Sequence, residues 1–142
     1  MTESKRSWRA WAHGYVGYPK SMKHNPGFLT LVNDAKERVQ EIDITEYQNL
    51  PREGHLVIDV REDHEWAAGH AEGAIHLSKG IIERDIETRV PDTSTKMVLY
   101  CGGGYRSALV ADALRQMGYR DAISLGGGWR AWNEAGLPVT KD

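Results

Sequence analysis

The segment KMVLYCGGGYRSALVADALRQMG, residues 96–118, carries the strongest structural signal in the chain. Its first part, residues 96–100, is an apolar run without polar alternation, which predicts a strand buried on both faces. Its last part, residues 107–117, places apolar side chains at three- and four-residue spacing, which predicts a helix that ends at Gly118. The sequence therefore predicts a buried strand, a glycine-rich turn and a helix in direct succession.

The same alternation of apolar runs and amphipathic segments continues on both sides of this segment. Strands are expected at the other short apolar runs, which are 42–44, 55–60, 74–77 and 122–125. Helices are expected at the other amphipathic segments, which are 29–41, 45–49, 63–68, 80–89 and 129–135. Apolar strands separated by helices favour an α/β fold, in which helices cover both faces of a parallel sheet.

The beginning of the chain differs from the rest. Asn25-Pro26-Gly27 is a turn signal, and the residues before it are rich in aromatic side chains and hold five basic residues against one acidic residue. We therefore expect an aromatic, basic N-terminal extension at 1–27, with a short helix from Ser7, and a single domain at 28–142. The extension is too aromatic for a disordered tail, and we expect it to pack on its own domain or on a partner.

The composition excludes several classes of protein. With 142 residues, 40% of them hydrophobic and 27% charged, the chain fits one soluble domain. No apolar run is long enough for a membrane span and no apolar segment follows the basic start, so we expect a cytoplasmic protein. The net charge of −2 argues against nucleic-acid binding. One cysteine and six scattered histidines predict neither an internal disulfide nor a metal site, and no cofactor is expected.

The glycine-rich turn after residue 100 is where we expect chemistry, because parallel sheets bind ligands at the carboxyl ends of their strands. The sole cysteine, Cys101, stands there and is followed by Gly102, Gly103 and Gly104. Glycines allow successive N–H groups to point inward as an anion nest, and the helix that starts near Ser107 adds its positive end. A sulfur anion is stabilised in such a loop, so Cys101 is the candidate nucleophile. The alternative is an inert buried cysteine beside a flexible turn.

Four motifs in order resemble the single-domain members of the rhodanese family. They are VLYCGGGYRSA at 98–108, VIDVRE at 57–62, GHAEGAIHL at 69–77, and GGGW at 126–129 followed by Trp132 and GLPV at 136–139. The likeness spans about Ile42 to Val139. It implies a rhodanese-like fold for residues 28–142, with a central parallel five-stranded sheet and helices on both faces.

The resemblance implies ping-pong sulfur transfer. Cys101 takes a sulfane sulfur from a small anionic donor, thiosulfate or a persulfide, holds it as a persulfide and passes it to a thiol, cyanide or a protein acceptor. The residues expected at substrate are Gly102, Gly103, Gly104, Tyr105, Arg106 and Arg61, with Asp59 and Ser107 in support. For Arg61 the sequence leaves open binding of an anionic donor or pairing with a carboxylate such as Glu62 or Glu65. Arg106 either faces the pocket or fixes the loop.

Other residues and partners are expected as follows. Trp66, His70 and Trp129 are expected to be packing or rim residues rather than catalysts. Neither nucleic acid nor a membrane is expected as a partner, and the sequence leaves the oligomeric state open.

One departure from the family bears on the donor. Rhodaneses that use thiosulfate carry basic residues directly after the cysteine, where this chain has Gly102 and Gly103. The sequence therefore predicts weak turnover of thiosulfate and favours a thiol persulfide or a protein donor.

Two alternative functions stay open. The first is a sulfur-carrier or regulatory binding module with little turnover. The second is a phosphatase or arsenate reductase of the same fold. Cell-cycle phosphatases place five residues between cysteine and arginine, whereas four separate Cys101 from Arg106. The shorter loop makes a smaller cradle, which suits a sulfur atom better than a phosphate.

Overall fold

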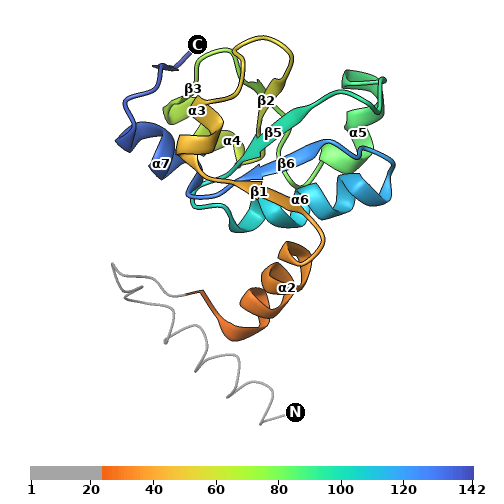
Figure 1. Cartoon of the computed structure of the whole chain (residues 1–142). Helices are drawn as coiled ribbons and strands as arrows, with labels where there is room; N and C mark the ends of the chain where they lie inside the picture. Colours follow the sequence, from red (N-terminus) through yellow and green to blue (C-terminus); the bar gives the residue numbers. More distant parts are fainter. Residues whose placement is uncertain (1–23) are drawn as a thin grey trace, which may run out of the picture.

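A five-stranded parallel sheet forms the centre of the molecule (Figure 1). The computed structural model describes residues 24–142, so the short helix expected from Ser7 lies outside the described residues. The strands follow the order β1-β6-β5-β2-β4, and every adjacent pair is parallel. Their bounds are β1 Gln40–Ile42, β2 Leu56–Asp59, β4 Ile75–His76, β5 Met97–Tyr100 and β6 Ala122–Leu125. The predicted fold class is confirmed.

Helices cover both faces of the sheet because successive side chains of a strand point to opposite sides. On β5, Met97 and Leu99 belong to the core beneath α5 (Ile82–Arg89) and α6 (Tyr105–Gln116). Val98 and Tyr100 belong to the opposite core, which includes side chains of α3 (Ile44–Gln48) and α7 (Gly128–Glu134). This double burial explains why the strands are continuous apolar runs.

The N-terminal helix α2 (Pro26–Lys36) begins and ends earlier than the expected 29–41. Pro26 occupies the first helical turn, where its missing N–H has no intrahelical partner to lose, so the turn signal starts a helix. The boundary expected between residues 27 and 28 thus falls inside α2. The helix packs against α6, and Arg38 joins the two by a 2.8 Å ion pair with Asp112.

The chain after α2 also runs differently from the expectation. β1 occupies Gln40–Ile42 instead of 42–44. α3 begins at Ile44, one residue before its expected start, because the Asp43 carboxylate caps it by accepting the N–H of Glu46 at 2.8 Å.

A small antiparallel ribbon joins β3 (His70–Ala71) to β7 (Val139–Thr140), and the sequence did not predict it. Two-residue strands carry no periodicity that a sequence pattern can reveal. The remaining helix, α4 (Asp63–Ala68), lies where it was expected. α5 starts at Ile82 and α6 at Tyr105, each two residues from its expected start.

Candidate active site

Cys101 follows β5 at the carboxyl edge of the sheet, where β5 lies between β6 and β2. Its Sγ accepts hydrogen bonds from the backbone N–H of Gly104 at 3.1 Å and of Ser107 at 3.4 Å. Both donors belong to the start of α6, so the helix directs its positive end at the sulfur. The residue is 1% exposed. A negative charge on this sulfur is therefore held by main-chain amides out of bulk water.

A pair of buried hydroxyls extends this environment. Ser107 Oγ lies 3.5 Å from Cys101 Sγ and 2.8 Å from the hydroxyl of Ser124 on β6. Both serines are fully buried. When Ser124 donates to Ser107, the Ser107 proton is free to be donated to a negatively charged sulfur.

The three loop glycines have different roles. Gly104 carries a φ of +101°, and a Cβ there would lie 3.2 Å from the amide nitrogen of Gly127. Gly102 is half-buried and Gly103 is exposed. Two amides, those of Gly104 and Ser107, therefore donate to the sulfur. The sequence suggested a nest of successive glycine amides, and of the three glycines only Gly104 donates to Sγ.

The start of α7 is bonded to the back of this loop. The N–H of Trp129 donates to the carbonyl of Cys101 at 2.7 Å, and the N–H of Arg130 donates to that of Gly102 at 3.2 Å. Gly128 has a φ of +48°, and a side chain there would collide with the Cys101 carbonyl. The sequence analysis used residues 126–128 only as part of the motif at 126–129, although three successive glycines also indicate a close backbone approach.

Arg61 lies in the interior and not in an open pocket, since it is only 3% exposed. Its guanidinium bonds to Asp59 at 2.8 Å and to the carbonyl of Gly69 at 2.7 Å, and it covers the ring of Trp129 at 4.5 Å. Tyr100 donates its hydroxyl proton to the same Asp59 carboxylate at 2.6 Å. This buried network ties β2 to β5, to the segment before β3 and to α7.

Of the two roles left open for Arg61, the structure shows the pairing with a carboxylate, but neither Glu62 nor Glu65 is the partner. Its partner is Asp59, because residues two apart at the end of an extended strand point the same way. The Asp59 carboxylate is bonded to Arg61 and Tyr100, and no hydrogen bond joins it to the Cys101 sulfur.

Arg106 both fixes the loop and lines a pocket, which answers the question that the sequence left open. Its guanidinium bonds to the two carboxylate oxygens of Glu65 on α4 at 2.7 and 3.2 Å. Hydrogen bonding to Arg106 lowers the pKa of Glu65, so the carboxylate stays ionised. The loop is thereby attached to α4.

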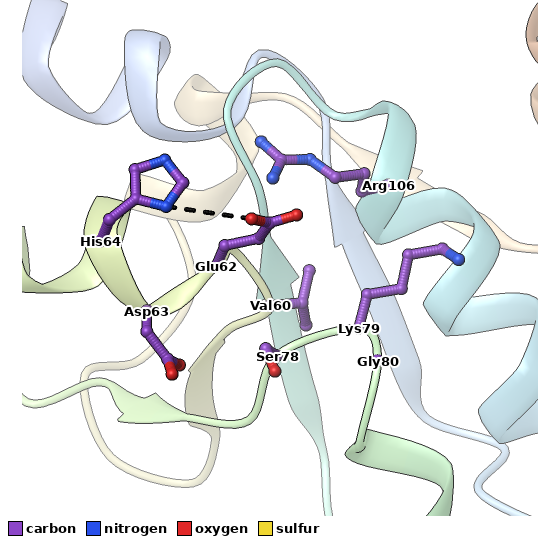
Figure 2. A pocket seen from close by; sticks show the side chains of 8 residues that line it. All are labelled: Val60, Glu62, Asp63, His64, Ser78, Lys79, Gly80 and Arg106. Atoms are coloured by element: carbon purple, nitrogen blue, oxygen red, sulfur yellow. Dashed lines mark ion pairs between the residues drawn. The ribbon is translucent and has the colours of Figure 1, made fainter.

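A pocket of about 620 Å³ opens beside the loop (Figure 2). It lies at the carboxyl ends of β2, β4 and β5, and residues from all three connections line it: Val60, Glu62, Asp63, His64, Ser78, Lys79, Gly80 and Arg106. Sequence reasoning named only Arg106 of this set as a site residue. The others follow different strands, and no shared motif indicates that they meet.

Aromatic rings crowd the other side of the loop. The Tyr105 ring lies 4.2 Å from that of His24 and 6.3 Å from that of Phe28. The ammonium of Lys36 lies 5.2 Å above it. Tyr105 is thus a contact of α2 and of His24, which precedes that helix.

The expected packing residues lie in aromatic contacts. Trp66 stacks on His70 with centroids 3.4 Å apart, and Trp129 packs beneath Arg61. Within residues 24–142 no group of three or more histidine, cysteine or acidic side chains is arranged to hold a metal ion. Over the same residues, no helix has the length and apolar character needed to cross a bilayer.

Comparison with known proteins agrees with this geometry. The rhodanese-like domain model matches residues 43–135, and the chain therefore belongs to the rhodanese-like domain family. It is 28% identical over 100 residues to the thiosulfate sulfurtransferase GlpE of Haemophilus influenzae, which covers 70% of this chain and 93% of that protein. It is 29% identical over 130 residues to the protein High Arsenic Content 1, mitochondrial, of Arabidopsis thaliana, with 83% and 77% covered.

Solved structures share the fold. A rhodanese from E. coli, determined with anions, superposes with a TM-score of 0.55 at 28% identity, covering 62% of this chain and 99% of that one. A Rhodopseudomonas palustris protein of unknown function, described as a possible tyrosine phosphatase, has a TM-score of 0.71 at 24% identity. That match covers 86% of this chain and 98% of the other.

Proposed function

We propose that the protein is a sulfurtransferase that carries a sulfane sulfur as a persulfide on Cys101. The observation that supports it most is the pair of amides, of Gly104 and Ser107, within hydrogen-bonding distance of the buried Sγ. These donors stabilise a thiolate and a terminal sulfur in the same cradle, as a two-step transfer requires. The similarity to a thiosulfate sulfurtransferase supports the same reaction.

The proposed reaction has two half-reactions. The Cys101 thiolate attacks the outer sulfur of a donor, the sulfur–sulfur bond of the donor breaks, and the remainder leaves with the bonding electrons as sulfite or a thiolate. An acceptor nucleophile, which is a thiol, cyanide or a protein thiol, then attacks the outer sulfur of the persulfide. Cys101 leaves as the thiolate, and the enzyme returns to its starting state.

The charges near the loop suggest which donors work well. Gly102 and Gly103 carry no charge, and Arg106 is already paired with Glu65 at 2.7 Å. A dianion such as thiosulfate therefore meets little uncompensated positive charge on the loop itself. We propose that thiosulfate is a poor donor and a persulfide a better one.

The cytoplasmic location and the division of the chain at 27/28 stay predictions.

Mass spectrometry of the treated protein tests the proposal. After incubation with a polysulfide, we expect an added mass of about 32 Da, one sulfur, on Cys101, and release of that sulfur to cyanide or a thiol. Cys101→Ser is the control, and it should take up no sulfur while keeping its circular dichroism spectrum. An unmodified Cys101, or a Cys101→Ser variant that still transfers sulfur, would refute the proposal.

Oxyanion chemistry is the second candidate, because one structural relative is described as a possible tyrosine phosphatase and one sequence relative is named for arsenic content. The loop argues against it, since Arg106 binds Glu65 and the sulfur has two amide donors. We expect no hydrolysis of p-nitrophenyl phosphate and no reduction of arsenate in the presence of glutathione. Turnover of either substrate that Cys101→Ser abolishes would favour this candidate.

A binding module without turnover is the remaining alternative. A Cys101 persulfide that forms and yet resists every acceptor would favour a sulfur carrier over an enzyme.

A further inference from the structure

The guanidinium of Arg106 lies over the loop beside the sulfur. Its Nη2 atom is 3.1 Å from the point where a Cβ at Gly102, the residue after Cys101, would stand. The residue after Arg106 is Ser107, whose N–H donates to Cys101 Sγ at 3.4 Å. Hydrogen bonding to Glu65 raises the pKa of Arg106, and the charge of Cys101 adds to this rise, so Arg106 is a permanent cation. It is therefore positioned to contact an anion that approaches the sulfur.

One carboxylate occupies both terminal nitrogens of this guanidinium. Nη1 donates to one carboxylate oxygen of Glu65 at 2.7 Å, and Nη2, the atom over Gly102, donates to the other at 3.2 Å. Glu65 is itself held by its own helix, because its carboxylate also accepts the N–H of Glu62 at 3.2 Å. Figure 2 shows the Arg106 side chain extending from the start of α6 toward α4. The cation nearest the loop is thus neutralised by a carboxylate that α4 keeps in place.

We infer that Glu65 is the residue that selects sulfur donors by their charge. The attraction between Arg106 and a bound donor scales with the negative charge of the donor. Neutralisation by Glu65 therefore weakens binding of a dianion more than binding of a monoanion. This inference rests on the proposed function and names a residue that determines donor specificity at the same site, through its effect on Arg106.

Two donors of equal chemistry and different charge separate this effect. Thiosulfate is a dianion, and methanethiosulfonate is a monoanion in which a methyl group replaces one charged oxygen. In both, the Cys101 thiolate attacks the outer sulfur and the sulfur–sulfur bond of the donor breaks. Sulfite or methanesulfinate leaves with the bonding electrons, and Cys101 holds the persulfide anion. No proton and no further reactant takes part in this step.

The ratio of kcat/KM for thiosulfate to kcat/KM for methanethiosulfonate is the quantity to measure, with cyanide as the acceptor. In a two-step transfer, kcat/KM for the donor reports the donor half-reaction alone. Glu65→Gln keeps the shape of the side chain and frees the Arg106 charge, so it should raise the ratio about threefold, mainly through a lower KM for thiosulfate. Damage to the fold lowers both values and does not produce this gain.

Three further variants complete the test. Arg106→Gln leaves Glu65 negative and should lower the ratio about threefold, and the double variant Glu65→Gln/Arg106→Gln should return it to the wild-type value. The control Glu53→Gln removes an exposed carboxylate between α3 and β2, and it should leave the ratio unchanged. Added salt should reduce both shifts, because it screens the charges. The inference is overturned if Glu65→Gln does not raise the ratio or if the double variant keeps the gain.

A binding experiment tests the inference without sulfur transfer. Thiosulfate is titrated into Cys101→Ser, which forms no persulfide, while the backbone amide resonances of the loop are followed. Adding Glu65→Gln to this protein should tighten thiosulfate binding about five- to tenfold. If the wild-type protein forms no persulfide with any donor, the proposed function fails and this titration still decides the inference. If the persulfide forms but Glu65→Gln does not tighten binding, the inference fails and sulfur transfer stands.

Discussion

At the scale of single residues, the environment of Cys101 depends on hydroxyls as well as amides. The Ser107 hydroxyl lies 3.5 Å from the Cys101 sulfur, and it lies 2.8 Å from the hydroxyl of Ser124. The two serines are equally buried, but only Ser107 reaches Sγ. We therefore expect Ser107 to act in sulfur transfer as well as in stability, and Ser124 to act in stability alone.

Replacing either serine by alanine should therefore have different effects on transfer. Each variant leaves one buried hydroxyl without its partner, and we expect both to lower the free energy of unfolding by about 1–3 kcal/mol. Ser107→Ala should also lower kcat for sulfur transfer about tenfold, because a donor to the charged sulfur is lost. Urea unfolding and steady-state transfer assays measure both quantities. Equal kcat values for Ser107→Ala and Ser124→Ala would contradict the role given to Ser107.

Asp59 is the residue on which the buried ion pair depends. Its removal leaves the Arg61 charge buried and unpaired, so Asp59→Ala should cost about 3–5 kcal/mol of unfolding free energy. Tyr100→Phe is the matched comparison, since it removes one hydrogen bond to the same carboxylate and should cost about 1–3 kcal/mol. Chemical denaturation measures the loss of unfolding free energy in each variant and shows which loss is larger. A larger loss for Tyr100→Phe than for Asp59→Ala would be inconsistent with a paired Arg61.

At the scale of elements, α7 is attached to the sulfur-bearing loop through Gly128. Gly128→Ala places a Cβ against the Cys101 carbonyl at a φ of +48°, and we expect a loss of at least about 2 kcal/mol in unfolding free energy together with reduced transfer. Gly27→Ala, in α2 with open space around it, should instead stabilise by about 0.5–1 kcal/mol. Thermal unfolding and transfer assays are the measurements. Normal activity in Gly128→Ala would mean that α7 does not position the loop.

The pair between α4 and α6 should give stability a dependence on acid pH. Hydrogen bonding to Arg106 lowers the folded-state pKa of Glu65 below its unfolded value. Its contribution is therefore complete above the ordinary carboxyl pKa of about 4.3 and is lost as pH falls through the lower folded value. The unfolding free energies of wild type and Glu65→Gln, measured from pH 7 to pH 3, should differ most at neutral pH and converge in acid. A constant difference would disprove the linkage.

The sheet was predictable because β2, β5 and β6 are apolar runs that alternate with amphipathic helices, and a parallel sheet covered by helices buries both faces of such strands. Cys101 and its loop followed from the same pattern. The β3–β7 ribbon was not predictable, because pairing between residues 70–71 and 139–140 is non-local and leaves no periodicity. The pocket around Lys79 forms where the connections after three different strands meet. The spacing and the types of its residues do not indicate that they meet, and the partner of Arg61 was likewise not evident among the nearby carboxylates.

At the scale of the whole molecule, α2 belongs to the domain, since Val32 and Ala35 are buried and the helix covers α6. A chain that starts at residue 24 should transfer sulfur as the full chain does. A chain that starts at residue 38 exposes the covered face of α6 and should unfold at a clearly lower temperature. Differential scanning calorimetry and transfer assays compare the two. Equal midpoint temperatures of unfolding for the two shortened chains would show that α2 contributes nothing to the stability of the fold.

The bonds from Trp129 and Arg130 to the carbonyls of Cys101 and Gly102 have a consequence for biosynthesis. Cys101 is translated well before residues 129 and 130 leave the ribosome, and until then these two carbonyls lack the partners that hold them in the finished protein. A nascent or prematurely terminated chain thus contains the thiol without its completed surroundings. The loop therefore takes its final hydrogen-bonded form only after residues 129 and 130 have been synthesised and α7 has packed against it.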